Sequence, residues 1–235
     1  MIVANKLSKK YGQSVVLRLL DVTIRPHRVT AIVGPNGTGK TTFIKSVLGL
    51  VRPDAGELWF DGERILSDPG YRARIGYMPQ IARFPENLTA NEFLNFLTDL
   101  RGETTEREEL IQLFNLQSQM NKQLRVLSGG TKQKVNAVAA LMFAPDLYIL
   151  DEPTAGLDPV AAGVMKQLIQ RERARGRTII ITSHIMSEIE ELADDIVYLT
   201  DGQAAFSGTV SDLRASTAQT TLERAVATLM RACEQ

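Results

Sequence analysis

Short apolar runs alternate along the chain with segments in which apolar residues recur at helical spacing. After the first run, Phe43, Ile44, Val47 and Leu48 share one helical face, and Gly49 is suited to end that helix. Apolar runs separated by helices predict a parallel sheet covered on both faces. The runs that predict its strands span residues 29–34, 147–153, 178–184 and 195–202.

Two further segments break this alternation. Residues 56–65 carry an Asp-Gly pair between apolar positions, which predicts a hairpin and some antiparallel sheet near the N-terminus. Residues 84–144 carry no clear strand pattern, and a Thr89…Glu92 capping box opens one of their helices. We therefore expect a helical subdomain inserted into the sheet domain.

The remaining segments complete the expected organisation. The basic run at residues 171–178 is interpreted as the solvated end of a helix, with cations near its C-terminal dipole and Gly176 as the stop. We expect one domain over residues 1–215, with the helical subdomain at about 84–144. A short helical tail is expected over residues 216–235.

A glycine-rich segment between a predicted strand and a predicted helix matches the P-loop pattern G-x-x-x-x-G-K-[ST]. Its backbone N–H groups can surround a phosphate at the start of the helix. Lys40 supplies a point charge for the β- and γ-phosphates, and the Thr41 hydroxyl can bind Mg²⁺. The pattern predicts a nucleoside triphosphate site at Gly34, Asn36, Gly37, Gly39, Lys40, Thr41 and Thr42.

Polar residues follow two of the predicted strands. Asp151 ends an apolar run, where it can hold Mg²⁺, and Glu152 follows as a candidate base for the attacking water. His184 ends another run, at the sheet edge where ligands bind, although a single histidine can also be structural. His27 lacks this context and is interpreted as a surface turn residue.

A second segment suited to bind an anion lies in the middle of the chain. Ser128 can cap a helix and offer its hydroxyl, while Gly129 and Gly130 allow a phosphate to approach the backbone. The alternative interpretation is a plain serine cap followed by a glycine turn. Neither segment alone explains why one chain would carry two phosphate-binding segments.

Charge and composition limit the partners and the compartment. Among 235 residues there are 27 Lys and Arg and 27 Asp and Glu, so nothing indicates bulk attraction to nucleic acid. Cys233 is the only cysteine, which excludes an intramolecular disulfide and suits a reducing cytosol. The longest apolar run, 137–144, is far shorter than the ~20 residues that cross a bilayer. We expect a cytoplasmic protein.

The motifs occur in an order that resembles the ATP-binding subunit of ABC transporters over residues 1–213. They are Tyr11, GPNGTGKTT, YMPQ ending at Gln80, LSGGTKQK, LYILDEP, AGLD and SH. LSGGTKQK is the specific element, because P-loops alone are widespread. The resemblance implies an α/β fold: a P-loop NTPase core with mixed sheet, an N-terminal antiparallel β-subdomain and an inserted α-helical subdomain.

The resemblance also explains the second phosphate-binding segment. In that family two ATPase domains dimerise head to tail, and the Ser-Gly-Gly of one protomer closes on the ATP held by the P-loop of the other. The implied ligands are ATP and Mg²⁺, with Thr41, Gln80 and Asp151 at the metal. A homodimer, or a heterodimer with a second ATPase, is expected to serve integral membrane permease subunits from the inner face of the cell membrane.

Individual roles follow from the same resemblance. Tyr11 would stack on adenine, although it can also be an ordinary strand tyrosine, and Gln80 would contact Mg²⁺ and the water. Glu152 would be the base, His184 would contact the γ-phosphate, and Asp158 would cross the dimer interface. In two places the sequence departs from the family pattern. Thr131 replaces a usual glutamine, which removes or replaces the contact of a longer amide, and residues 25–29 replace a usual Gly-Glu turn.

Several alternatives remain open at this stage. A soluble mechanical ATPase of DNA repair or translation is disfavoured, because those relatives carry large insertions or two ATPase domains. Residues 78–97 expose apolar side chains suited to dock a helix of a membrane subunit. Several stretches resemble ATPases of an exporter-type transporter for copper-dependent maturation of nitrous-oxide reductase. The alternative is a general exporter of drug, lipid or polysaccharide.

Overall fold

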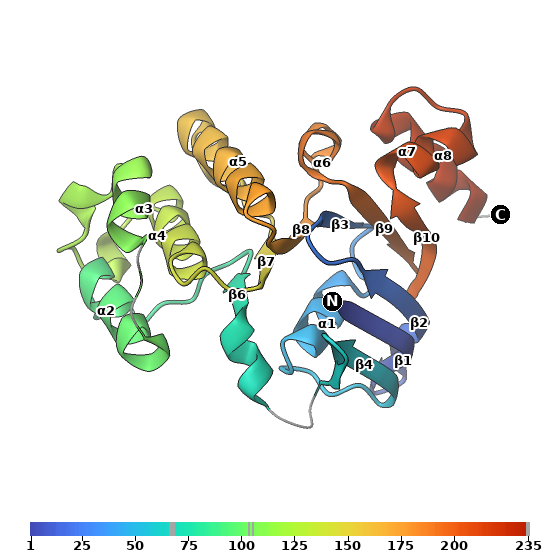
Figure 1. Cartoon of the computed structure of the whole chain (residues 1–235), viewed down its shortest axis with the longest axis horizontal. Coiled ribbons are helices and arrows are strands. Elements are labelled where there is room, and N and C mark those ends of the chain that lie inside the picture. The colour runs from blue at the N-terminus through green and yellow to red at the C-terminus, as the bar shows by residue number, and fades with distance from the viewer. Residues whose placement is uncertain (66–68, 103, 105, 234–235) are drawn as a thin grey trace. The chain divides into compact units, whose positions relative to one another are not determined.

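The computed structural model (Figure 1) describes residues 1–65, 69–102, 104 and 106–233. Its contacts divide the chain into two compact units. The first unit contains Met1–Arg72 and Thr178–Gln235, and the second contains Ala73–Arg177. No helix in the described part of the chain is long and apolar enough to cross a membrane.

The first unit contains an antiparallel sheet with the strand order β2-β1-β4-β5. Its first hairpin joins β1 (Ile2–Tyr11) to β2 (Ser14–Ile24), and its second joins β4 (Ala55–Phe60) to β5 (Glu63–Arg64). The turn of the second hairpin is Asp61-Gly62, with both residues at positive φ. The antiparallel sheet predicted from the sequence is therefore confirmed.

The parallel strands of this unit centre on β3 (Val29–Val33), which lies between β8 (Thr178–Thr182) and β9 (Asp195–Thr200). Every residue of β3 and β8 is buried, as continuous apolar runs predict. The edge strand β10 (Gln203–Thr209) pairs antiparallel with β9. The four helices described in this unit are α1 (Lys40–Val47), α6 (Met186–Leu192), α7 (Val210–Thr217) and α8 (Leu222–Cys233).

The tail expected from residue 216 differs in detail. Residue 215 falls inside α7, which begins with a complete capping box between Thr209 and Asp212. The separate tail helix is α8, and its apolar side chains Leu222, Ala225 and Val226 are buried. The pattern of the sequence therefore indicated a C-terminal helix but not its start, because the α7 cap lies several residues earlier.

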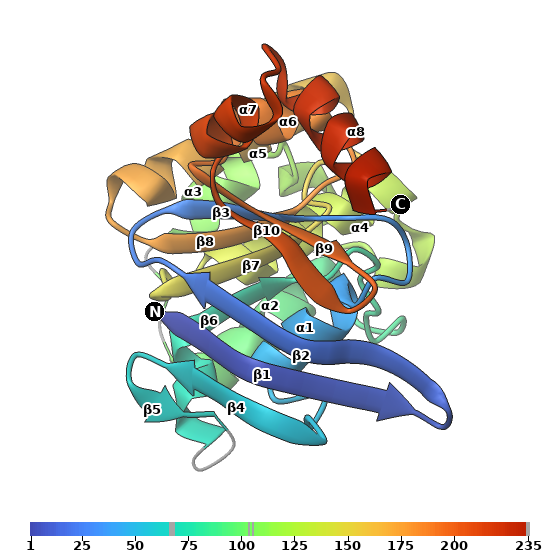
Figure 2. The same ribbon diagram turned by 90° about the vertical axis from the view of Figure 1, so that its right-hand side faces the viewer.

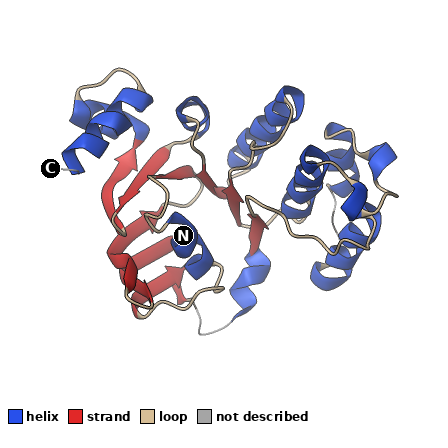
Figure 3. Ribbon diagram, turned by 180° about the vertical axis from the view of Figure 1, so that it is seen from behind, coloured by secondary structure: helices blue, strands red, loops and turns tan. Residues whose placement is uncertain are grey.

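The second unit contains two parallel strands and most of the long helices (Figure 3). β6 (Ile75–Met78) pairs with β7 (Leu147–Asp151). The helices are α2 (Ala90–Arg101), α3 (Arg107–Leu113), α4 (Gly129–Leu141) and α5 (Pro159–Ala174). A 3-10 segment, Pro69–Arg74, spans the boundary of the two units, and short 3-10 turns lie at Gln117–Gln119 and Leu124–Val126.

The predicted helical character of residues 84–144 is confirmed. The described residues there hold no named strand, and their only β-type pairing is an isolated bridge between Thr89 and Gln123. The capping box of α2 is complete, since the Glu92 N–H donates to Thr89 Oγ1 at 3.1 Å and the Thr89 N–H donates to Glu92 Oε2 at 2.8 Å. Local cap chemistry therefore fixes the start of α2.

The basic run at residues 171–178 contains the end of α5, as predicted, with Arg171 and Arg173 in the last turn of that helix. Arg171 lies 2.8 Å from Glu106 and 2.6 Å from Glu109 near the start of α3. Arg175 pairs with Glu106 as well, and it lies 2.8 Å from Glu172, whose side chain is buried. Gly176, at φ +79°, follows the helix as predicted, whereas the ion pairs with Glu106 and Glu109 were not predicted from the sequence.

The network also includes β7, the strand that ends at Asp151 and is followed by Glu152. Tyr148, the second residue of β7, donates its hydroxyl to Glu172 Oε2 at a distance of 3.3 Å. Burial is the main cause that raises the pKa of Tyr148, and the nearby Glu172 charge adds to it, so the phenol stays a donor. This network therefore connects α3, α5 and β7 inside the second unit.

Removal of the buried carboxylate should destabilise this unit. Glu172→Ala leaves Arg171, Arg175 and Tyr148 without their shared acceptor, and we expect a loss of about 3 kcal/mol. The matched change Gln167→Ala, at an exposed site on the same helix, should cost little. Thermal melting of both variants tests this, and equal melting temperatures would show that the network does not stabilise the fold.

Candidate functional site

The P-loop joins β3 to α1 through three glycines in the left-handed region. Gly34, Gly37 and Gly39 have φ values of +147°, +84° and +102°. A β-carbon on Gly34 would lie 2.1 Å from the Leu199 carbonyl oxygen, and one on Gly39 would lie 2.8 Å from that of Val16. Only glycine fits these two positions, so the spacing of the motif follows from close backbone packing.

The polar side chains of the loop are held by its own carbonyl groups. Lys40 Nζ donates to the carbonyl oxygens of Gly34 at 2.6 Å and Pro35 at 2.9 Å, and Thr38 Oγ1 donates to Pro35 at 2.9 Å. The loop residues Asn36 and Gly37 are exposed, Thr41 is exposed, and Thr42 is half-buried. The loop therefore presents backbone donors and a cation at a helix start, the arrangement that binds phosphate.

A cavity of about 580 Å³ lies beside the P-loop inside the first unit. The loop residues Pro35, Asn36, Gly37 and Thr38 form one wall. Tyr11, predicted to stack on adenine, ends β1 and faces Ser14 across the hairpin, and its ring is 49% exposed. Lys9 Nζ lies 5.5 Å from the centre of the Tyr11 ring. The remaining walls of the cavity come from residues that sequence reasoning missed.

His184 lies in the first unit, two residues beyond β8. Its side chain is exposed, between the buried Ser183 and the start of α6. The Ser183 hydroxyl accepts from the Ile185 N–H at 3.1 Å and donates to Glu188 at 3.3 Å, which shapes the turn that presents His184. His27, by contrast, lies in an exposed turn at φ +59°, as predicted.

The second unit places Gln80 and the acidic pair at one edge of its two strands. Met78 of β6 is paired with Leu150 of β7 in a parallel register. Gln80 follows two residues after Met78, while Asp151 and Glu152 directly follow Leu150. All three residues therefore emerge at the same carboxyl edge, where functional groups gather in parallel sheets.

Glu152 stands out among these residues in its backbone. Its φ is +51°, a left-handed conformation that costs a non-glycine residue free energy, and its side chain is 9% exposed. The neighbouring Asp151 influences the pKa of Tyr77 on β6. Burial is the main cause that raises the pKa of Tyr77 to about 12, and the Asp151 charge adds to the shift.

Ser128 caps α4 with its hydroxyl, which accepts from the Thr131 N–H at 3.2 Å. The hydroxyls of Ser128 and Thr131 lie 2.8 Å apart, so threonine at this position makes a contact of its own. A β-carbon on Gly129 would meet no atom within 4 Å, whereas one on Gly130 would lie 3.0 Å from the Gly156 carbonyl oxygen. Ser128 and Gly129 are exposed, so no side chain or backbone of the described chain covers this helix start at Gly129.

Asp158 caps α5 and also binds the Ser-Gly-Gly helix. Its Oδ1 accepts from the Ala161 N–H at 2.9 Å, and its Oδ2 lies 2.8 Å from Lys134 Nζ of α4. The hydrogen bond from Lys134, followed by that from the Ala161 backbone, holds the pKa of Asp158 below its ordinary value. Asp158 is therefore a carboxylate at neutral pH.

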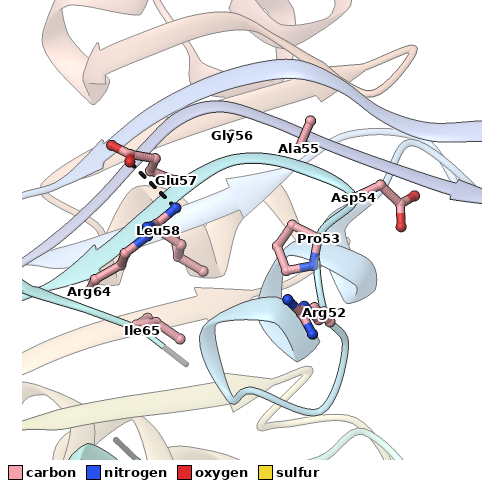
Figure 4. A pocket seen from close by; sticks show the side chains of 9 residues that line it. All are labelled: Arg52, Pro53, Asp54, Ala55, Gly56, Glu57, Leu58, Arg64 and Ile65. Carbon is pink, nitrogen blue, oxygen red and sulfur yellow. Dashed lines mark ion pairs between the residues drawn. The ribbon is translucent and has the colours of Figure 1, made fainter. Parts of the chain in front are cut away.

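A second cavity of the first unit, about 610 Å³, lies between β4 and the segment that follows α1 (Figure 4). Arg64 and Glu57 form an ion pair of 3.4 Å across it. None of the residues predicted as functional lines this cavity. The cavity beside the P-loop is therefore the one related to the predicted chemistry.

Sequence reasoning missed the residues of that cavity that lie outside any motif. They are Val15, Val16, Arg18, Thr200, Asp201, Gly202 and Cys233. No local signal could have found them, because the β9–β10 turn and the end of α8 are brought to the P-loop only by the fold. Sequence reasoning also gave no weight to residues 25–29. In the structure Arg25 Nε lies 2.9 Å and Arg28 Nη2 lies 3.0 Å from the buried Asp195.

The sequence model of the ABC transporter family matches residues 17–155. A Nod factor export ATP-binding protein I of Burkholderia orbicola is 34% identical over 208 residues, which are 86% of this chain and 68% of that protein. The ABC-type transporter ATP-binding protein EcsA of Bacillus subtilis is 31% identical over 214 residues, or 88% of this chain and 87% of that protein.

Two solved structures are similar over most of the chain. An ATP-binding subunit of an ABC transporter superposes with a TM-score of 0.91 at 30% identity and covers 98% of this chain and 99% of that one. A dimeric, post-hydrolysis ATP-binding cassette bound to ADP and Pi gives 0.79 at 25% identity, over 89% and 98%. The motifs, the fold and these matches together show that the chain belongs to the ABC transporter ATP-binding family and is an ATPase.

Proposed function

We propose that this ATPase is the motor subunit of an exporter-type membrane transporter and hydrolyses Mg-ATP at a head-to-tail dimer interface. The start of α4 is the observation that carries the proposal. Ser128 and Gly129 form an exposed helix N-terminus with open space around it, in a chain that already has a P-loop. A second copy that presents its own nucleotide is the natural ligand of this surface. The similar cassette bound to ADP and Pi is described as dimeric.

The P-loop would hold the phosphates from one side. Its backbone N–H groups and Lys40 bind the β- and γ-phosphate oxygens, and the ammonium exchanges its bonds to Gly34 and Pro35 for them. Thr41, Gln80 and Asp151 offer hydroxyl, amide and carboxylate oxygens, the donors that Mg²⁺ prefers. When bound, the metal ion would neutralise charge on the phosphates.

The remaining residues would act on the water and the interface. Glu152 accepts the proton of the attacking water, and His184 contacts the γ-phosphate and holds the water in line. Asp158, a carboxylate fixed by Lys134 and Ala161, would contact the partner protomer. Tyr11 would stack on the base, because its half-exposed ring can receive a planar ligand.

Exposed apolar side chains in the second unit support docking of a membrane subunit. Ile81 is 76% exposed, and Phe96 and Leu100 lie one turn apart on α2 at 50% and 66%. Within the segment 78–97, Phe84 instead packs on Phe93 with ring centres 5.0 Å apart. Part of the predicted docking segment therefore packs within the chain, and the exposed part suits a helix-in-groove contact.

The cargo is a finer part of the proposal. Export is favoured by the similar proteins, one of which is described as a Nod factor export ATP-binding protein. A role in copper-dependent maturation of nitrous-oxide reductase rests on the resemblance of sequence stretches alone. General export of a drug, lipid or polysaccharide is the alternative, and a soluble mechanical ATPase is the alternative class.

Replacement of the proposed base should stop turnover without loss of ATP binding. Glu152→Gln keeps the shape of the side chain but removes the proton acceptor, so ATPase activity should fall by roughly 10²–10⁴-fold. Glu86→Gln, at an exposed carboxylate of the same unit, is the matched control. Phosphate release and equilibrium ATP binding are measured for both, and turnover that survives in Glu152→Gln would assign the base to another group.

Action of the Ser-Gly-Gly segment on a second protomer can be tested with two defective proteins. Gly129→Ala adds a methyl group that meets nothing within its own chain, so folding should persist while ATPase activity falls by about 10–100-fold. Gly163→Ala, an equally open helix position, is the control and should stay active. Mixed with Lys40→Ala protein, Gly129→Ala protein should regain turnover, because one composite site is intact. Absence of such rescue would show that the Ser-Gly-Gly segment does not act on the nucleotide of a partner protomer.

The transporter class is tested by a pull-down from detergent-solubilised native membranes. Glu152→Gln protein with Mg²⁺ and ATP should retain a multi-spanning membrane protein, and the other captured proteins would show whether copper-enzyme maturation is involved. Ile81→Asp should weaken this capture, whereas Leu19→Asp, an exposed apolar site of the first unit, should not. Capture of only soluble or nucleic-acid-bound partners would contradict the transporter function.

A further inference from the structure

The cavity beside the P-loop has a wall that no ATPase motif supplies. Besides the P-loop, it is lined by β2 through Val15, Val16 and Arg18, by the β9–β10 turn and by Cys233 at the end of α8. In Figure 2 the end of α8 lies near the loop that runs from β3 to α1. Segments about 200 positions apart in the sequence therefore line one cavity.

Backbone packing holds three of the four walls in place. A β-carbon on Gly39 would lie 2.8 Å from the Val16 carbonyl oxygen, and one on Gly202 would lie 2.6 Å from the same oxygen. The Arg18 N–H donates to the Gly202 carbonyl at 2.9 Å. The P-loop and the β9–β10 turn are thus both packed against β2, and this packing fixes three walls of the cavity.

The fourth wall is attached differently. α8 packs through its first turns, where Leu222, Ala225 and Val226 are buried, whereas Arg231 to Cys233 are exposed. A helix of this length extends about 18 Å from its first residue, so its far end reaches the cavity without being buried there. The end of α8 is therefore the wall that can respond to the contents of the cavity.

The chemistry of the cavity fits the part of a nucleotide that leaves the P-loop. Its volume of about 580 Å³ lies within the ~300–1,000 Å³ of small-molecule sites. Its lining combines the apolar Val15 and Val16 with the polar Thr200 and Asp201, which suits a flat base and a ribose with hydroxyl groups. Tyr11 is paired with Ser14, directly before this lining.

We propose that the end of α8 forms a wall of the nucleotide site, so that Cys233 lies beside the base and ribose of bound ADP or ATP. The C-terminal helix then contributes to nucleotide affinity. Any bulky group attached to Cys233 competes with the nucleotide for this cavity. The proposal adds a binding residue outside all the motifs that the sequence presents.

The single cysteine allows a direct test on the full chain. Cys233 is the only thiol, so N-ethylmaleimide labels one position, and its rate of labelling is followed by mass spectrometry. ADP at saturating concentration should slow labelling by about tenfold, with half-protection at the dissociation constant of ADP measured separately. Pyrophosphate at a concentration that displaces ADP fills only the P-loop and should not protect.

A relocated thiol separates contact from general effects of binding. In the double variant Cys233→Ser with Glu223→Cys, the thiol lies at the exposed beginning of α8, away from the cavity, and ADP should leave its labelling rate unchanged. Conversely, protein labelled at Cys233 should bind ADP about tenfold more weakly, and a methylthio group should have a smaller effect than a maleimide.

Three results would overturn the proposal. Labelling of Cys233 at the same rate with saturating ADP would show that the thiol is not beside the nucleotide. Equal protection by pyrophosphate and ADP would show that ordering of the P-loop, and not the base, shields the thiol. Failure of the unlabelled protein to bind ADP would contradict the nucleotide site as a whole. This outcome is distinguished from the other two because ADP binding is measured without labelling Cys233.

Discussion

The close approach of the P-loop backbone to strands β2 and β9 is the constraint on which the first unit depends. With the Leu199 oxygen only 2.1 Å from where a β-carbon of Gly34 would lie, and the Val16 oxygen 2.8 Å from that of Gly39, the loop can follow only one path. That path ends at the first residue of α1, where N–H groups converge. The same packing borders the neighbouring cavity, so the loop path and this cavity, where we propose that the base binds, have one physical origin.

A comparable constraint operates in the second unit. Gly130 leaves room for the Gly156 carbonyl, and Lys134 of the same helix binds Asp158, the cap of α5. The start of α4 and the loop after β7 are therefore attached to each other at two places. Any displacement of the Ser-Gly-Gly segment must also displace the residues that follow Glu152. These two contacts are the physical connection between the Ser-Gly-Gly segment and the residues that follow Glu152.

The sequence predicts the parts of this molecule that depend on neighbours along the chain. The buried strands, the α2 capping box and the glycine pattern of the P-loop follow from local sterics and hydrogen bonding, and all appear as predicted. Pairings over long sequence separations could not be predicted. Glu172 of α5 binds Tyr148 of β7, and Cys233 reaches the P-loop cavity, because tertiary structure alone brings these groups together. The contact between the hydroxyls of Thr131 and Ser128 could not be predicted either, because it depends on the side-chain rotamers of both residues.

The ion pairs also bear on the class of partner. Four arginines from residues 25–29 and 171–178 pair with carboxylates, each inside its own unit. Arg25 and Arg28 bind the buried Asp195, and Arg171 and Arg175 bind Glu106 and its neighbours. A phosphate backbone would have to compete with these carboxylates, of which Asp195 and Glu106 each bind two arginines. Arginines that are already paired with carboxylates add less net positive charge to a surface than unpaired ones, which agrees with the equal numbers of basic and acidic residues in the chain.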